Sequence, residues 1–130
     1  MFLSYIVVMV GGALGSAARL WLSLFCAMRW GETFPVGTLA VNALGCLAIG
    51  VFSALTGPDG MIMTSPLVRQ FVMIGILGGF TTFSSFGLQT ISLMSDGEWL
   101  YAALNIVLSV VACLAFVWLG TILVSLLTHK

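Results

Sequence analysis

Charged residues divide the chain into four long uncharged stretches. The chain has eight charged residues, and all of them lie outside four ranges: 1–18, 33–58, 70–95 and 99–129. A helix of about 20 predominantly apolar residues crosses the roughly 30 Å hydrocarbon core of a bilayer. The pattern therefore predicts an all-α membrane protein whose residues 1–130 form a single domain of four transmembrane helices. We expect the four spans at about residues 2–28, 33–56, 65–95 and 99–127.

The composition indicates that the bilayer is the solvent. Hydrophobic residues make up 61% of the chain and charged residues 6%, whereas about a quarter of a soluble domain is charged. Four basic side chains are too few for a nucleic-acid-binding patch, so we expect no nucleic-acid partner. Four acidic residues and one histidine leave no acid–base pair or metal cage, and we expect no enzyme.

The basic residues give almost no preferred orientation in the membrane. Sequential spans put Arg69 and Lys130 on one side and Arg29 on the other, with Arg19 inside the first span. Because the excess of Lys and Arg sets orientation, two against one is close to no bias. The chain could therefore insert in both directions and pair with an inverted copy of itself. A weakly biased protein with a single orientation fits this count equally well.

Small residues predict close helix contacts. Gly11 and Gly15 form a small-xxx-small pair in the first span, and Gly75 and Gly79 form another in the third. Such pairs let helix backbones approach closely in lipid, so they support a tight bundle or an oligomer. Three cysteines also lie in the apolar spans, without a CxxC spacing: Cys26, Cys46 and Cys113. We expect them to pack as small core residues and to have no chemical role.

The third span has the most unusual sequence. Residues 75–87 read GILGGFTTFSSFG, with four glycines and four hydroxyl residues inside a membrane crossing. Glycine and β-branched Thr lower helix propensity, and hydroxyl groups can satisfy freed backbone groups. We therefore expect a helix broken near Gly78–Thr82 that lines a cavity. The alternative is a continuous helix with a packing face of small residues.

Neutral polar and aromatic side chains are the candidate anion ligands. Phe80, Phe83 and Phe86 share one helical face, and the edge of a Phe ring carries positive partial charge. The other reading of this stripe is core packing. Amide and hydroxyl side chains also pair at i, i+4 in two spans: Thr38 with Asn42, and Asn105 with Ser109. Such groups can also join helices, which for Asn105 is an equally good explanation; for Asn42 we favour a functional role.

Three motifs resemble the Fluc (CrcB) fluoride channel family. They are GGFTTFSSF at 78–86, GTLAVN at 37–42 and GGALGSAAR at 11–19, and the resemblance covers the whole chain. It implies a passive, fluoride-selective channel in the bacterial inner membrane. It also implies an antiparallel, dual-topology homodimer with two pores and a structural Na⁺ ion at its two-fold axis.

The resemblance also implies roles for individual residues. The sodium ligands would be the backbone carbonyls of Gly78 and Thr81 from both subunits. Arg19 matches the arginine of the family's first span, where a structural and a vestibule role are equally open. Gln89 stands where the family commonly has Glu, so a function that needs a carboxylate there is in doubt. The implied fluoride pore comprises the donor Asn42, the rings Phe83 and Phe86, the polar-track residue Ser109, and Thr38, Ser84 or Ser85 as further donors.

Two other functions also fit four short-looped spans. A small multidrug-type exporter uses the same number of spans, but proton coupling needs an ionisable acid within the membrane. Neither Asp nor Glu occurs in the four uncharged stretches, which makes this alternative poor. The second alternative is a non-conducting membrane assembly subunit whose motifs only pack helices. A measurement of fluoride flux distinguishes the channel from both.

Overall fold

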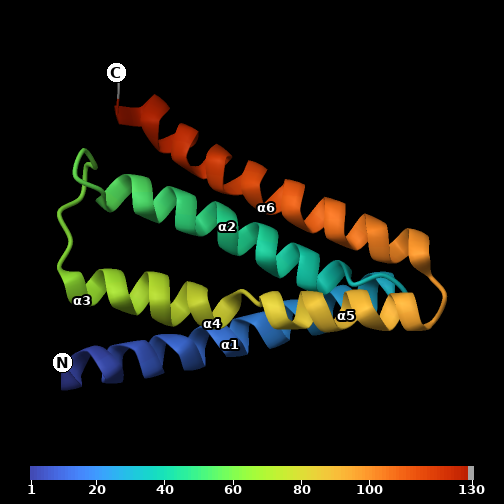
Figure 1. The fold of residues 1–130 in the computed structure, drawn as a ribbon. Helices are drawn as coiled ribbons and strands as arrows, with labels where there is room; N and C mark the ends of the chain where they lie inside the picture. The colour runs from blue at the N-terminus through green and yellow to red at the C-terminus, as the bar shows by residue number, and fades with distance from the viewer. Residues whose placement is uncertain (129–130) are drawn as a thin grey trace.

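The computed structural model describes residues 1–128, and these are almost entirely helical (Figure 1). The expectation for Lys130 in the orientation count lies outside the described residues. The elements are α1 (Phe2–Trp30), α2 (Val36–Thr56), α3 (Pro66–Arg69), the π-helix η1 (Gln70–Leu77), α4 (Gly78–Phe80), α5 (Phe83–Ser95) and α6 (Trp99–Thr128).

Among residues 1–128, four helical stretches are long and apolar enough to cross a membrane. They are Phe2–Trp30, Val36–Thr56, Pro66–Ser95 and Trp99–Thr128. The third stretch is composite, because α3, η1, α4 and α5 follow one another within it. This architecture agrees with the four spans predicted from the charge pattern, and it is that of a multi-pass membrane protein.

The four stretches alternate in direction, as Figure 1 shows. The N-terminus, the α2–α3 connection and the end of α6 lie at one end of the molecule, and the other two connections lie at the opposite end. Every acidic residue of the described chain lies in a connection rather than in a helix: Glu32, Asp59, Asp96 and Glu98. The helices themselves therefore contain no carboxylate side chain within residues 1–128.

Glycines bring α1 into backbone contact with the third stretch. Gly11 and Gly15 are buried, and a Cβ added to Gly15 would collide with the carbonyl oxygen of Ile76. From the other side, a Cβ on Gly79 would lie 2.6 Å from the carbonyl oxygen of Gly12. The predicted small-residue pairs thus face each other, and dispersion contacts between backbones hold α1 against η1 and α4.

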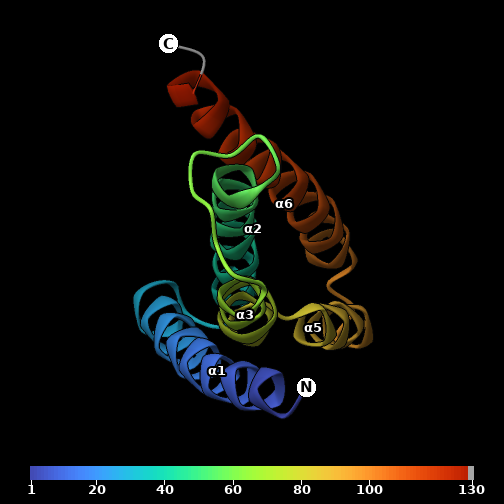
Figure 2. The ribbon, with the colours of Figure 1, turned by 90° about the vertical axis from the view of Figure 1, so that its left-hand side faces the viewer.

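Among pairs of single helical elements, α2 and α6 make the most extensive contact, and Figure 2 shows them side by side. A Cβ on Gly50 would collide with the carbonyl oxygen of Val117, and one on Gly120 would lie 2.6 Å from the carbonyl oxygen of Leu47. The two helices run in the same direction (Figure 1). Because both helices rise equally per residue, the residues one turn before Gly50 and one turn before Val117 also lie opposite each other.

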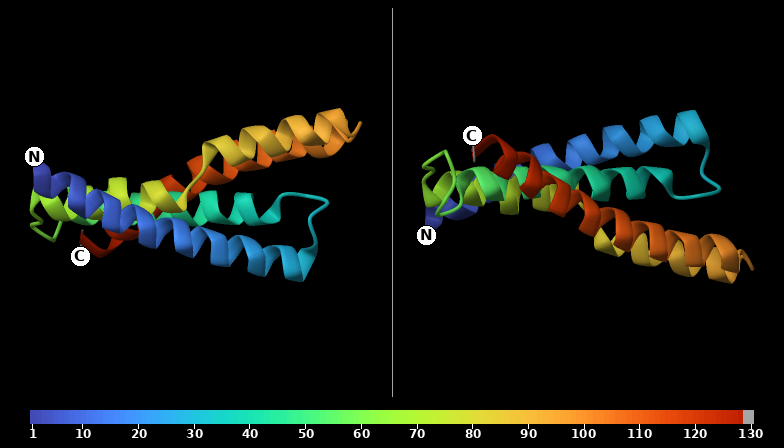
Figure 3. Two further views of the ribbon diagram at one scale, coloured as in Figure 1. Left: turned by 90° about the horizontal axis from the view of Figure 1, so that it is seen from below. Right: turned by 90° about the horizontal axis from the view of Figure 1, so that it is seen from above.

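The molecule forks at the link between α4 and α5. Seen from below and from above, α5 and the first part of α6 form one arm (Figure 3). The last part of α1 and the first part of α2 form the other arm, and the arms diverge toward the end that carries the α1–α2 and α5–α6 connections. The fork therefore starts where the third stretch changes from α4 to α5.

The close approach at Gly15 gives the first testable prediction. Gly15→Ala should lower the stability of the protein by about 1–3 kcal/mol, because its methyl group overlaps the backbone at Ile76. Gly12→Ala is the matched control: nothing lies within 4 Å of its Cβ, and Ala has the higher helix propensity. Thermal unfolding midpoints of the two variants in detergent measure the difference. Equal midpoints would contradict the contact.

Candidate functional site

Two residues with extended backbone, Thr81 and Thr82, separate α4 from α5. Their φ and ψ angles are −81° and 158° for Thr81 and −152° and 111° for Thr82. In a continuous helix the amide of Thr82 would bond to the carbonyl of Gly78. Here it donates instead to Oδ1 of Asn42 at 2.7 Å. The carbonyl of Gly78 is thus released from its helical partner.

Asn42 satisfies both backbone groups of Thr82. Besides accepting from the Thr82 amide, its Nδ2 donates to the Thr82 carbonyl oxygen at 2.9 Å. Asn42 is 9% exposed and Thr82 is 8% exposed, so water does not replace these bonds readily. Since freed backbone groups cost several kcal/mol in a bilayer, this pair of bonds is what makes the extended link tolerable.

Side chains of α1 reach two other carbonyl groups at the link. Ser16 Oγ donates to the carbonyl oxygen of Gly79, and Arg19 Nη1 donates to that of Thr81, each at 3.4 Å. Both distances are long, so these bonds are weaker than those of Asn42. Side chains of α1 therefore donate to the carbonyl oxygens of Gly79 and Thr81, and Asn42 of α2 donates to that of Thr82.

Thr82 also starts α5. Its Oγ1 accepts from the amide of Ser85 at 3.2 Å, and it donates to Oγ of Ser85 at 2.9 Å. An extended Ser or Thr immediately before a helix is a preferred N-cap. Thr82 is not among the site residues predicted from the sequence, although a hydroxyl residue where a helix is expected to restart is a signal that could have identified it.

A cavity of about 430 Å³ lies beside this link, between the third stretch, α2 and α6. We call it the central cavity. Most of its wall is apolar, and the predicted site residues on it include two backbone positions and four side chains. These residues are Gly78, Thr81, Asn42, Phe83, Phe86 and Ser109.

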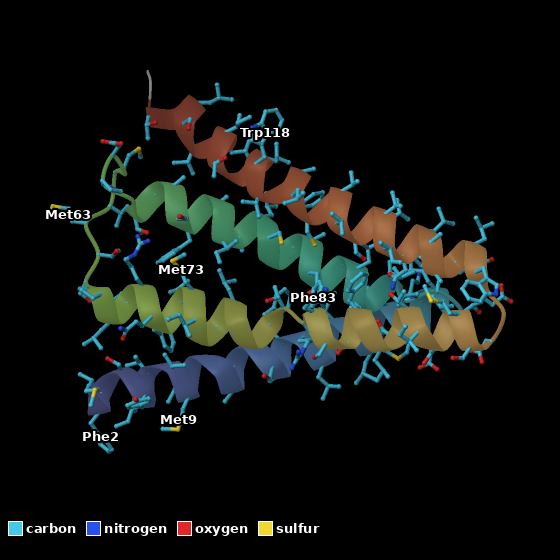
Figure 4. The ribbon with its side chains drawn as sticks, viewed as in Figure 1. Phe2, Met9, Met63, Met73, Phe83 and Trp118 are labelled. Carbon is cyan, nitrogen blue, oxygen red and sulfur yellow. The ribbon has the colours of Figure 1, made fainter. Side chains whose placement is uncertain are left out.

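Phe83 and Phe86 differ sharply in their environment. The ring of Phe86 is 9% exposed, whereas that of Phe83 is 81% exposed. Their ring centroids are 5.3 Å apart with an interplanar angle of 45°. Figure 4 places Phe83 at the start of α5, beside the extended link. Within this chain, Phe86 is therefore held by packing and Phe83 is presented at the surface.

A second space of about 920 Å³ is lined by residues of α1, the start of α2 and α5, that is, by both arms of the fork. We call it the polar cleft. Its wall includes Arg19, Thr38, Thr82, Ser85 and Gln89, and its acidic residues belong to the connections at the open end of the fork. Arg19 is the one basic residue of this wall within residues 1–128. The cleft thus leads from the charged connections to the neutral donors around the extended link.

The structure distributes the predicted site residues between these two spaces. The polar cleft takes Arg19, Thr38 and Ser85, and the central cavity takes the six residues named above. Thr82 belongs to both walls, so the Asn42–Thr82 pair lies between the two spaces. Ser84 is exposed and lies outside both walls, with its Oγ 3.4 Å from Oγ1 of Thr82.

Asn105 connects α6 to α5. It is 1% exposed, its Nδ2 donates to Oγ1 of Thr90 at 2.9 Å, and its Oδ1 accepts from Ser109 Oγ at 3.4 Å. Thr90 in turn donates to the carbonyl oxygen of Phe86. These bonds agree with the helix-joining reading of Asn105, and they hold Ser109 at the wall of the central cavity.

The cysteines differ from the expectation of core packing in one respect. Cys26 is 3% exposed and is indeed a core residue. Cys46 and Cys113 are only half-buried, and both line the central cavity. Both lie on the parts of α2 and α6 that form the wall of this cavity. The spacing of residues along the sequence does not reveal which helix faces border a cavity.

Comparison with known proteins identifies close relatives. The family model described as "CrcB-like protein, Camphor Resistance (CrcB)" matches residues 6–121. A protein of Rhodospirillum rubrum is 53% identical over 118 residues, which is 91% of this chain and 92% of the relative. One of Paramagnetospirillum magneticum is 48% identical over 127 residues, covering 98% and 99% of the two chains.

Both relatives are named "Fluoride-specific ion channel FluC", and so is one of Opitutus terrae that is 53% identical over 91% of this chain and 89% of its own. These names describe ion channels rather than enzymes, in agreement with the expectation from composition. The match extends through the motifs on α1, α2 and the composite third stretch that form the walls of both spaces. The chain therefore belongs to the CrcB family, as those motifs predicted.

Proposed function

We propose that this chain forms a fluoride-selective channel that lets the ion cross the membrane passively. The observation that carries the proposal is the position of the Asn42–Thr82 pair, with neutral hydrogen-bonding groups on the two spaces that meet there. The names of relatives that are 48–53% identical support the choice of fluoride.

The chemistry of the walls suits a small, strongly hydrated anion. Conduction requires binding that replaces hydration water but stays weak enough for the ion to leave. Hydroxyl groups of Thr38 and Ser85 would act in the polar cleft, where Arg19 attracts the anion. Asn42 and Ser109 would continue the path in the central cavity, with the positive ring edges of Phe83 and Phe86. One of the two Nδ2 hydrogens of Asn42 remains after its bond to Thr82, so this amide can also donate to an anion.

The distribution of acidic residues supports a channel over a proton-coupled exporter. Proton coupling requires an ionisable side chain within the membrane. All four acidic residues lie in the connections between helices, outside α1 to α6. The polar side chains on the walls of the two spaces within the helices, such as Asn42, Ser109 and Thr38, are neutral and do not titrate near neutral pH.

We further propose that the working unit is an antiparallel, dual-topology homodimer with two pores in the bacterial inner membrane. The near balance of basic residues supports insertion in both directions. Phe83 and Gly78 are predicted site residues beside the central cavity, and both are exposed in a single chain. Their exposure supports a second copy of the chain that covers this face. In such a dimer the two copies would complete each other's pores.

The residues present fit a structural Na⁺ ion shared between two copies. The carbonyl oxygen of Gly78 has lost its helical partner, and the residue is exposed. The carbonyl oxygen of Thr81 accepts from Arg19 at 3.4 Å and retains a second lone pair. Unwound carbonyl groups are common Na⁺ ligands in membrane proteins. Two oxygens from one chain form only part of an ion's shell, so the second copy would supply the matching pair.

Fluoride efflux from liposomes tests the channel directly. Purified protein in vesicles loaded with fluoride should release it down its gradient, and a pH gradient across the vesicle should not drive uptake. A fluoride electrode follows the release, and protein-free vesicles give the background. Well-folded protein that releases no fluoride would refute the channel, whereas uptake driven by the proton gradient would favour the exporter.

Phe83→Ile should abolish efflux without destabilising the chain. The ring is 81% exposed, so its replacement removes few contacts within one chain, but it removes the ring edge from the proposed path. Phe2→Ile is the matched control, because Phe2 is 79% exposed and lies at the far end of α1 (Figure 4). Efflux rates and unfolding midpoints of both variants decide the matter. Normal efflux by Phe83→Ile would remove this ring from the site.

Asn42→Asp should also abolish efflux, but for two reasons at once. The carboxylate cannot donate to an anion, and it faces the Thr82 carbonyl that Nδ2 now satisfies. We therefore expect a loss of about 1–3 kcal/mol of stability in addition to the loss of flux. The same assays measure both effects, and a variant with unchanged efflux would exclude Asn42 from the path.

Labelling of a surface position tests dual topology. Met63 lies in the α2–α3 connection and is fully exposed (Figure 4), so a cysteine can be introduced there in a background without the native cysteines. A membrane-impermeant maleimide applied to intact cells should label about half of the Met63→Cys copies, since insertion occurs both ways. Labelling of all copies or of none would establish a single orientation and overturn the inverted dimer.

A further inference from the structure

Two cysteines of the central cavity have no part in the proposed fluoride path. Cys46 lies on α2 and Cys113 on α6, and both line the cavity together with Asn42 and Ser109. Both are free thiols in the described chain. The third cysteine, Cys26, is buried in α1 and does not belong to this wall. The pair therefore differs from Cys26 in both exposure and surroundings.

The packing of α2 on α6 holds the two thiols opposite each other. At the closest approach of these parallel helices, Gly50 lies against Val117. Cys46 precedes Gly50 by four residues and Cys113 precedes Val117 by four, so each lies about one turn back on the same face. Both residues also lie on the wall of the same cavity, so their side chains border a common space. Two rigid helices, rather than flexible loops, thus fix the pair.

The surroundings of the pair select a particular class of ligand. Neighbouring wall residues such as Ile49, Val110 and Leu114 are apolar, and the wall within residues 1–128 contains no carboxylate or imidazole. Zn²⁺ takes four ligands in structural protein sites, more than this pair provides. Soft thiolates select thiophilic cations. Two thiolates also neutralise a divalent cation, so the complex avoids the cost of an isolated charge in an apolar cavity.

We propose that Cys46 and Cys113 form a two-coordinate site for a thiophilic divalent cation, with Hg²⁺ as the probe. On binding, two S–H bonds break, two S–Hg bonds form, and two protons pass to water without any change of oxidation state. The bound ion joins α2 to α6 and occupies the central cavity beside Asn42. Fluoride passage is then blocked, a consequence that rests on the proposed channel function.

Mass measurement on the purified full-length protein tests the site without any flux assay. After incubation with HgCl₂ and a wash with a competing monothiol, the denatured chain should carry one mercury atom and lack two protons. Only one of its three thiols should then react with a maleimide. Zn²⁺ in place of Hg²⁺ should leave no adduct. A wild-type chain in which all three thiols react, or an adduct with the mass of two chains, would overturn the site.

Single substitutions provide the matched comparison. Cys46→Ser and Cys113→Ser should each retain the ion on the order of a hundredfold less strongly, because one ligand replaces two linked ones. Cys26→Ser should retain it as the wild type does. Equal retention by all three variants would refute the paired site.

Fluoride efflux separates this site from the proposed function. Hg²⁺ should stop efflux through the wild type and Cys26→Ser but not through Cys46→Ser, each compared with its own untreated rate. If untreated protein shows no efflux while the single-chain adduct forms, the channel proposal fails and the metal site stands. If efflux continues in protein that carries the adduct, the blockade is refuted.

Discussion

The two hydrogen bonds between Asn42 and the backbone of Thr82 are the interaction on which the site depends. A membrane helix normally satisfies its own amides and carbonyls, and a link of extended residues gives up that arrangement. Here the amide and the carbonyl of one residue are both taken over by one side chain, at 2.7 and 2.9 Å. Asn is suited to this because its side chain contains a donor and an acceptor in the same geometry as a peptide group.

The extended link also determines the shape of the molecule. Where α4 gives way to α5, the chain leaves the face of α1 and continues along α6 (Figure 3). The divergence opens the polar cleft on one side, while the central cavity lies on the other. Thr82 contributes to both walls, so the residue whose amide and carbonyl bond to a side chain instead of to the helix lies where the two spaces meet. The same local departure from helical geometry therefore both frees backbone groups and forms the site.

Close backbone packing elsewhere in the molecule stabilises the fold despite the extended link between α4 and α5. Gly15 and Gly79 bring α1 against the third stretch, and Gly50 and Gly120 bring α2 against α6. In lipid, such contacts replace the hydrophobic drive that water would provide. They also fix which side chains meet. The register of α2 on α6 puts Cys46 and Cys113 on the wall of one cavity, and the packing of α1 brings Arg19 to the Thr81 carbonyl.

The sequence by itself determined the membrane architecture, because the spacing of eight charges leaves room for four apolar spans and no more. It also directed attention to residues 75–87, since glycine and hydroxyl residues are costly in a helix. Only the tertiary structure decided how the candidates are grouped: Arg19, Thr38 and Ser85 on one space, and Asn42, Phe86 and Ser109 on the other. It also revealed the role of Thr82 and the facing thiols. Periodicity assigns a residue to a face of its own helix, but which face meets which neighbour depends on close contacts between segments far apart in the chain.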